Sequence, residues 1–184
     1  MKVLVLDGRR DDSEMASKIE KSLNKQLSGH EIKWASLREK RIDPCLGCFG
    51  CWIKTPGLCV INDDANEIIK QMAQSDLLIE LTPVTFGGYS SELKKILDRS
   101  IPNLLPFFKR YKGETHHFQR YENVPSNFTI GYQDEPEPGS RAVFENLAKR
   151  NVLNMTPPRS SCLVLDRQSN VDEMIAKSLK EVLE

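Results

Sequence analysis

Four of the five cysteines in this 184-residue chain fall close together, at Cys45, Cys48, Cys51 and Cys59. Their spacing is C-x2-C-x2-C-x7-C, and glycines 47 and 50 stand between the first three. Glycine permits the tight backbone that three thiolates need around one small metal centre. An odd, crowded set of cysteines suits a metal or redox cluster in a reducing compartment better than a disulfide framework.

The spacing leaves the occupant of the cysteine cluster open. It departs from the ferredoxin run, in which x3 and a proline close the motif. A tetrathiolate zinc site satisfies the ligand count, although zinc sites more often pair two cysteines with two distant ones. Free or redox-active thiols are a third alternative, because Phe49, Trp52 and the turn at 55–57 could form an apolar lid or a subunit contact. The fifth cysteine, Cys162, falls in an apolar run and is interpreted as a small core filler.

Two adjacent histidines, His116 and His117, are the other residues of a metal-ligating type. Neighbouring positions do not face one metal ion from a helix, so a solvated loop or a subunit contact is expected for them. They belong to an insertion, residues 102–127, that is rich in aromatic side chains. Long insertions of this kind in a compact domain are usually functional or pack on a partner.

The elements that position these residues follow from hydrophobic periodicity. Short apolar runs predict strands, and apolar residues at spacings of three and four predict helices. The strands are expected at 3–6, 31–37, 77–81, 128–132 and 162–165. The helices are expected at 12–27, 64–73, from Ser90 or Ser91 through Leu97, 140–152 and 171–183.

Strand and helix alternate five times, which implies right-handed crossovers and a parallel sheet covered on both faces. We therefore predict a three-layer, doubly wound α/β fold with a five-stranded parallel sheet. The simplest solution is the flavodoxin-like strand order 2-1-3-4-5. A Cys-rich loop at 42–63 and the aromatic insertion at 102–127 interrupt this pattern. Ligands enter such sheets at loops beyond the carboxyl ends of the strands.

Composition limits the function classes. The length predicts one domain over residues 1–184. Lys plus Arg and Asp plus Glu are 26 each, so the formal net charge is zero, which disfavours general nucleic-acid binding. No apolar run approaches the roughly 18 residues of a membrane helix. The first apolar stretch, Val3 to Leu6, is too short for a signal peptide, and a cytoplasmic protein is expected.

The segment TPVTFGGYSSELKKILDR, Thr82 to Arg99, resembles the signature loop and helix of the NADPH-dependent FMN reductase and flavodoxin-like flavoprotein superfamily. The cysteine spacing resembles the compact motif of the iron-sulfur flavoproteins, a branch of the same superfamily. The resemblance implies an FMN ring held by Pro83, Val84, Thr85, Phe86, Gly87 and Gly88. As one of the three alternatives above, it implies a 4Fe-4S cluster on Cys45, Cys48, Cys51 and Cys59.

The physical requirements of a flavin fit these loops. A flat isoalloxazine needs a rigid apolar wall and backbone N–H donors, and Phe86 is the candidate wall, although a plain strand-to-helix turn has similar residues. The FMN phosphate is expected at the first strand-to-helix loop, on Arg10 and Ser13, because a helix N-terminus attracts anions. Three carboxylates at 11, 12 and 14 are unfavourable there. Tyr132 could stack or hydrogen-bond near the flavin edge.

Together these features predict an FMN-dependent oxidoreductase that takes hydride from NADH or NADPH. Electrons would pass to a small acceptor such as a quinone, a free flavin or an iron-sulfur centre. No side chain needs to act as an acid or base, because the cofactor carries the chemistry. The resemblance also implies a homo-oligomer, a dimer or tetramer, in which the insertion covers the flavin site of a partner. The alternative is a non-catalytic electron carrier or binding module that has lost tight FMN binding.

Overall fold

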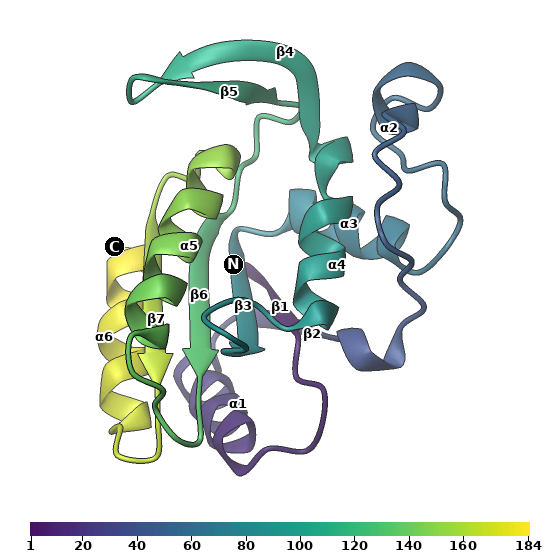
Figure 1. The fold of residues 1–184 in the computed structure, drawn as a ribbon. Helices are drawn as coiled ribbons and strands as arrows, with labels where there is room; N and C mark the ends of the chain where they lie inside the picture. The colour runs from purple at the N-terminus through teal and green to yellow at the C-terminus, as the bar shows by residue number, and fades with distance from the viewer.

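A computed structural model describes all residues, 1–184, and its core is one parallel sheet (Figure 1). The strands are β1 (Lys2–Asp7), β2 (Glu31–Ser36), β3 (Leu77–Pro83), β6 (Ser126–Tyr132) and β7 (Ser160–Leu165). Their order is β2-β1-β3-β6-β7, with every neighbouring pair parallel. The predicted order 2-1-3-4-5 is confirmed.

Helices cover both faces of the sheet, as predicted. They are α1 (Glu14–Gln26), α3 (Ala65–Gln74), α4 (Ser91–Arg99), α5 (Ser140–Met155) and α6 (Val171–Leu183). Apolar side chains of α1 and α6 pack on one face of the sheet, and those of α3, α4 and α5 pack on the other. Ser13 begins α1 by accepting from the Ala16 N–H at 3.3 Å, and Ser90 begins α4 by accepting from the Leu93 N–H at 3.2 Å.

The aromatic insertion differs from the long loop we expected, because it folds into an antiparallel hairpin. Its strands are β4 (Leu104–Tyr111) and β5 (Glu114–Gln119), joined by Lys112 and Gly113. Both turn residues have left-handed φ values, 49° and 80°, which match the twist of a two-residue hairpin turn. The turn sequence Lys-Gly could have signalled this hairpin.

The hairpin lies at the amino-terminal edge of the sheet, over the end of α5 (Figure 1). Gln119 donates from Nε2 to the Asn154 carbonyl at 3.1 Å, and Arg150 pairs with Glu114 at 2.7 Å. His116 is buried and lies within hydrogen-bond distance of Asn154 and Glu114, so the expectation of a solvated histidine loop is wrong for this residue. Within one chain the hairpin is far from the carboxyl edge that holds the predicted flavin loops.

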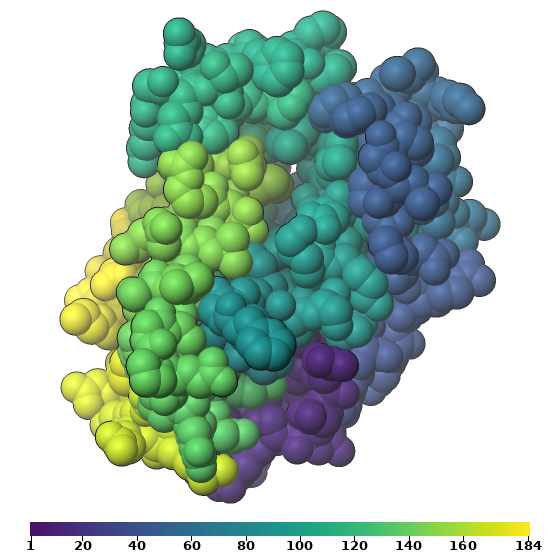
Figure 2. Space-filling view, in the orientation of Figure 1, coloured from purple at the N-terminus to yellow at the C-terminus, as the bar shows by residue number.

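The Cys-rich segment lies beside the hairpin and carries one short helix, α2 (Gly50–Ile53). A 3-10 turn, η1 (Leu37–Glu39), precedes this segment, and a second, η2 (Ile101–Asn103), links α4 to the hairpin. The Trp52 indole donates to the Leu104 carbonyl at 3.0 Å and joins the two segments, which meet at one end of the molecule in Figure 2. No helix is both long and apolar enough to cross a membrane.

Candidate functional site

The loop between β3 and α4 forms a tight, preorganised turn. Thr85 and Gly88 exchange two main-chain hydrogen bonds of 2.9 Å, with Phe86 and Gly87 at the tip. Both tip residues are left-handed, with φ values of 51° and 74°. Phe86 is 94% exposed. A strained aromatic residue held in solvent is typical of a surface that meets a ligand or partner.

Contacts with neighbouring loops fix this turn on the carboxyl edge of the sheet. The Val84 N–H donates to the Tyr132 carbonyl at 2.8 Å, next to the paired ends of β3 and β6. The Ser90 hydroxyl donates to the Gly8 carbonyl at 2.6 Å. At Gly131, a Cβ would stand 2.9 Å from Val84 Cγ2, so only glycine permits this close approach. The three loops that the sequence assigned to FMN therefore form one edge.

Tyr132 contributes its backbone to this edge, whereas its ring lies in the core beneath α1 and α6. The hydroxyl lies near Ser13 and has no hydrogen-bond partner within the chain. Burial raises the pKa of Tyr132 above its usual range, and the charges of Asp7 and Asp11 raise it further. The side chain is therefore placed toward the predicted phosphate loop rather than toward Phe86.

Two arginines in the β1–α1 loop have different environments. Arg9 donates to Asp7 at 2.6 Å and to Glu20 at 2.7 Å, so its charge is already engaged. Arg10 is exposed and makes no ion pair or side-chain hydrogen bond. Arg10 is thus the guanidinium of this loop that remains unpaired, and its contact with a phosphate stays a prediction.

The carboxylates of this loop are less unfavourable than the sequence suggested, because cations from other positions pair with two of them. Asp12 accepts from Arg38 at 2.7 Å, and Glu14 pairs with Lys18 at 2.8 Å. These contacts lower the pKa of both carboxyls. The main-chain N–H groups at the start of α1, apart from the one that Ser13 caps, remain free to bind an anion.

The cysteine loop is shaped by two left-handed residues between its thiols. Gly47 has a φ of 62° and Phe49 a φ of 54°. When left-handed residues stand between right-handed ones, successive main-chain N–H groups point into one concave site, called a nest. Nests bind anions and iron-sulfur centres in many proteins. The Gly47 N–H already donates to the Cys45 sulfur at 3.5 Å. All five cysteines are free thiols.

The four clustered thiols are close enough to influence one another. Burial raises the pKa of Cys51, and negative charge on Cys59, Cys45 and Cys48 raises it further. No three side chains of His, Cys, Asp or Glu converge closely enough to hold a single metal ion. The conformation therefore favours neither zinc nor an iron-sulfur cluster on these four thiols.

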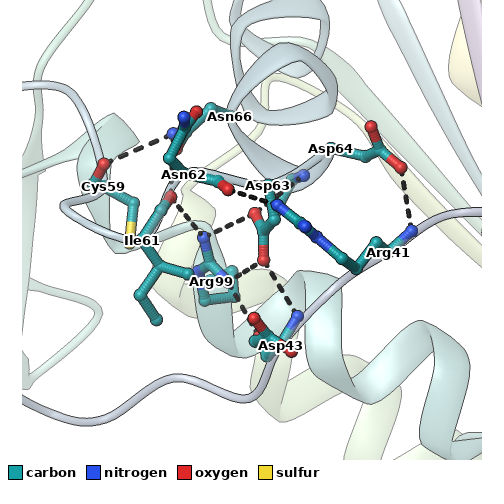
Figure 3. A network of polar contacts seen from close by, with 10 residues as sticks. Arg41, Asp43, Cys59, Ile61, Asn62, Asp63, Asp64, Asn66 and Arg99 are labelled. Carbon is teal, nitrogen blue, oxygen red and sulfur yellow. Dashed lines mark hydrogen bonds and ion pairs between the residues drawn. The ribbon is translucent and has the colours of Figure 1, made fainter.

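A buried ion pair anchors the cysteine loop to the fold (Figure 3). Arg99, the last residue of α4, donates from Nη1 and Nη2 to both carboxylate oxygens of Asp63 at 2.8 and 2.9 Å. The same two nitrogens also donate to the carbonyls of Asp43 and Ile61, whereas Nε is buried without a partner. The two sides of the loop are thereby joined through one guanidinium.

The same network extends through the neighbours of Asp63 (Figure 3). Asp63 accepts from the Asp43 N–H at 2.9 Å, and Asn66 donates to the carbonyls of Cys59 and Ile61. Burial alone would raise the pKa of Asp63, but the hydrogen bonds and charge of Arg99 lower it. Sequence reasoning missed this anchor, although the Leu-Asp-Arg ending of the helix contained its arginine.

The structure therefore places the predicted site residues in two groups. Arg10, Ser13 and the loop from Pro83 to Gly88 lie on the carboxyl edge of the sheet, with the backbone of Tyr132. The four clustered cysteines lie toward the opposite edge, beside η2 and the hairpin. Cys162 is half-buried on β7, where burial raises its thiol pKa to about 12, consistent with a packing role.

Residues 1–118 match the family described as NADPH-dependent FMN reductase. The chain belongs to this family. The match covers most of the chain, including both the cysteine loop and the β3–α4 loop. It confirms the resemblance carried by Thr82 to Arg99.

The curated relatives that this chain matches include iron-sulfur flavoproteins. One from Methanocaldococcus jannaschii is 39% identical over 114 residues, which are 61% of this chain and 58% of that protein. One from Methanosarcina thermophila is 34% identical over 73 residues, 40% of this chain and 37% of that protein. The matched stretches thus span 58% or less of these relatives.

Solved structures confirm the fold over the whole chain. An NAD(P)H:quinone oxidoreductase from Methanothermobacter marburgensis has a TM-score of 0.73 at 14% identity, covering 100% of this chain and 99% of that one. An azoreductase from Bacillus anthracis has a TM-score of 0.66 at 9% identity, covering 98% and 92%. At these identities the likeness concerns the fold.

Proposed function

We propose that the protein is an FMN-dependent oxidoreductase that oxidises NADH or NADPH and reduces a small acceptor such as a quinone, a free flavin or an iron-sulfur centre. The observation that carries this proposal is the turn at Thr85–Gly88, where the Phe86 ring stands 94% exposed on the carboxyl edge. Such an edge is where ligands bind in doubly wound sheets. Family membership and the likeness to an NAD(P)H:quinone oxidoreductase support the same activity.

Each group on this edge has a role in holding the cofactor. Phe86 and Pro83 provide an apolar wall for a flat ring, and the turn's rigidity keeps that wall in place without ligand. The Ser13 hydroxyl accepts from the Ala16 N–H and can still donate its own proton to a phosphate. Arg10 supplies the free positive charge. FMN, when bound, supplies the hydride and electron chemistry, so no catalytic acid or base is assigned.

A titration with FMN and with riboflavin tests the assignment of the phosphate site. Arg10→Gln should weaken FMN binding about three- to tenfold, as expected for the loss of one charge-assisted contact, and leave riboflavin binding unchanged. Lys177→Gln, which removes one positive charge from an exposed position of α6, is the matched control. Equal losses for both ligands in Arg10→Gln would contradict a phosphate role.

Turnover of NADH or NADPH distinguishes an oxidoreductase from a non-catalytic electron carrier or binding module. NADH or NADPH should be oxidised by the FMN-loaded protein with a quinone or free flavin present. FMN binding without such turnover would favour a flavodoxin-like electron carrier, and failure to bind FMN would favour a non-catalytic binding module. The exposed carboxylate of Asp11, which makes no ion pair, is the feature that favours this second candidate.

We also propose a 4Fe-4S cluster on Cys45, Cys48, Cys51 and Cys59. The support is the purely thiolate donor set, the left-handed Gly47 and Phe49, and the similarity to iron-sulfur flavoproteins. Protein purified without oxygen should show a broad brown absorption and about four iron and four acid-labile sulfide per chain, as the cluster's formula requires. Zinc at one per chain, or four thiols that react freely, would overturn the assignment.

A homo-oligomer, a dimer or tetramer, completes the proposal. Its support is the exposed aromatic side chains of the hairpin, Phe107, Phe108 and Phe118. Aromatic residues exposed together are typical of subunit interfaces. Light scattering at micromolar concentration should give a mass above that of one chain, and a 21.0 kDa species would refute this part of the proposal.

A further inference from the structure

One buried carboxyl takes no part in the sites described so far. Glu80 lies in the middle of β3 and is 6% exposed. Asn127 donates to its Oε1 at 3.0 Å and Thr129 to its Oε2 at 2.8 Å, but no cationic side chain pairs with it. A carboxyl buried without a cation is unfavourable when ionised, and such groups concentrate at functional sites.

Glu80 lines a cavity of about 440 Å³. The cavity lies between α4, α5, the hairpin and the short helix α2, and Figure 2 shows a hollow between the surfaces of α5 and α4 below the hairpin. Aromatic and polar side chains share the lining. Among them are Phe49, Trp52, Phe108, Asn127 and Asn151. The volume suits a small organic molecule.

No cationic side chain that lines the cavity is free to pair with Glu80. Lys94 is the lysine of the lining, and its ammonium is paired with Asp98 at 2.6 Å. His116 is held by Asn154 and Glu114. An anionic ligand would therefore meet no free cation and would lie against a carboxyl.

Several polar atoms near the cavity are also without partners. The Nδ1 atom of His117 and the hydroxyl of Tyr89 are buried and make no hydrogen bond. Asn151 lines the cavity and lies close to the Tyr89 hydroxyl. Buried polar atoms are normally satisfied, so these groups indicate a polar ligand rather than an apolar filler.

We propose that this cavity binds a small organic cation, a primary ammonium on an aromatic or aliphatic body. The ammonium donates to the Glu80 carboxylate, and the body packs against Trp52 and Phe108. These rings give the body of the ligand an apolar surface to pack on. The site is distinct from the FMN edge and does not depend on the proposed oxidoreductase activity.

Cation binding is coupled to proton release. Burial raises the pKa of Glu80, so the neutral acid is easier to form in the empty site than at an exposed glutamate. An incoming ammonium favours the carboxylate, and the carboxyl proton then leaves to solvent. The other titratable groups that face Glu80 or the cavity come from every packed element: Tyr89 before α4, Lys94 and Asp98 on α4, His116 and His117 on β5, and Cys162 on β7.

Calorimetry with three matched probes tests the proposal on the full chain. Phenethylamine should bind, 2-phenylethanol should bind at least tenfold more weakly, and phenylacetate should not bind. The heat of amine binding should change with the ionisation enthalpy of the buffer, since a proton is released. Added FMN should leave the amine affinity unchanged, because the two sites lie apart.

Two variants connect the binding to Glu80. Glu80→Gln keeps the size of the side chain and should lower amine affinity at least tenfold, with a thermal melt verifying that it folds. Glu92→Gln, which removes a carboxylate elsewhere on α4, should bind like the native protein. Equal binding of amine and alcohol, unchanged binding by Glu80→Gln, or no binding of amine at millimolar concentration would each overturn the proposal.

Discussion

Two aspartate–arginine pairs stabilise the two ends of this molecule in different ways. Asp7 and Arg9, two residues apart, lie at the carboxyl edge of the sheet, where Arg9 also pairs with Glu20. Asp63 and Arg99, 36 residues apart, join the cysteine loop to the end of α4. The first pair shapes a local loop, whereas the second holds together segments that are distant in the chain.

The pKa values reflect this difference. Burial raises the pKa of Asp7 despite the hydrogen bonds from Arg9, while the bidentate contact with Arg99 lowers the pKa of Asp63 despite burial. Asp63 also accepts main-chain hydrogen bonds from Asp43 and Ala65, which add to the effect of Arg99. The cysteine edge is therefore expected to depend on its ion pair more than the FMN edge does.

Removal of Asp63 is the strongest test of this comparison. Asp63→Ala should lower the free energy of unfolding by about 3–5 kcal/mol, because it leaves the buried Arg99 unpaired. Asp7→Ala should be less damaging, since Arg9 keeps Glu20. Urea denaturation measures both. Equal losses would show that the two pairs contribute alike.

Backbone strain gives the next largest contrast between the two edges. Gly87 and Gly47 are both left-handed, but a Cβ at Gly87 would stand 2.8 Å from Val143 Cγ1, whereas one at Gly47 meets nothing within 4 Å. Gly87→Ala should cost about 2–4 kcal/mol, from strain and overlap together. Gly47→Ala should cost about 1–2 kcal/mol, from strain alone.

Urea denaturation of Gly87→Ala and Gly47→Ala measures the loss in free energy of unfolding and so reports how rigid each loop is. A cost at Gly87 no greater than that at Gly47 would mean that Val143 moves aside freely. The β3–α4 turn would then be softer than its two reciprocal hydrogen bonds suggest.

Local periodicity predicted the sheet and its helices, because each strand and helix carries its own apolar pattern. It also predicted the carboxyl-edge loops, whose proline, glycine and serine residues act within a few positions of one another. The hairpin was missed because Pro106 interrupts its first strand, and Lys112-Gly113 is the short signal that could have revealed it.

The remaining features depend on contacts that no local pattern contains. Nothing near Arg99 in the sequence identifies Asp63 as its partner. Glu80 stands in an apolar run that predicts a buried strand, and the asparagine and threonine that satisfy it lie on β6, more than 40 residues away. Likewise, the sequence places two adjacent arginines before α1, and only the structure shows that Arg9 is paired with Asp7 and Glu20.

Phe86 allows a smaller test that separates binding from folding. Phe86→Ala should weaken FMN binding about tenfold, equivalent to about 1.4 kcal/mol, and leave unfolding nearly unchanged because the ring is exposed. Ile53→Ala, an exposed apolar residue on the cysteine side, is the control for FMN affinity. Fluorescence titration measures both variants, and equal affinity in Phe86→Ala and native protein would remove Phe86 from the cofactor site.

The smallest expected effect is on the pH dependence of stability in acid, to which Asp63 and Asp7 should contribute in opposite directions. The pKa of Asp63 is lower in the folded than in the unfolded chain, so its stabilisation is present above about pH 3.8 and is lost as pH falls further. The pKa of Asp7 is raised, so its carboxyl favours the folded state in acid and loses that advantage as pH rises above about 3.8.

Comparison with Asp63→Asn and Asp7→Asn isolates the two contributions. The free energy of unfolding of native protein should exceed that of Asp63→Asn by less and less as pH falls below about 3.8. Relative to Asp7→Asn, the free energy of unfolding of native protein should decrease as pH rises above about 3.8. Chemical denaturation at closely spaced pH values measures both. Slopes of the same sign would mean that Arg9 compensates Asp7 as fully as Arg99 compensates Asp63, and the distinction between a local and a long-range anchor would no longer hold.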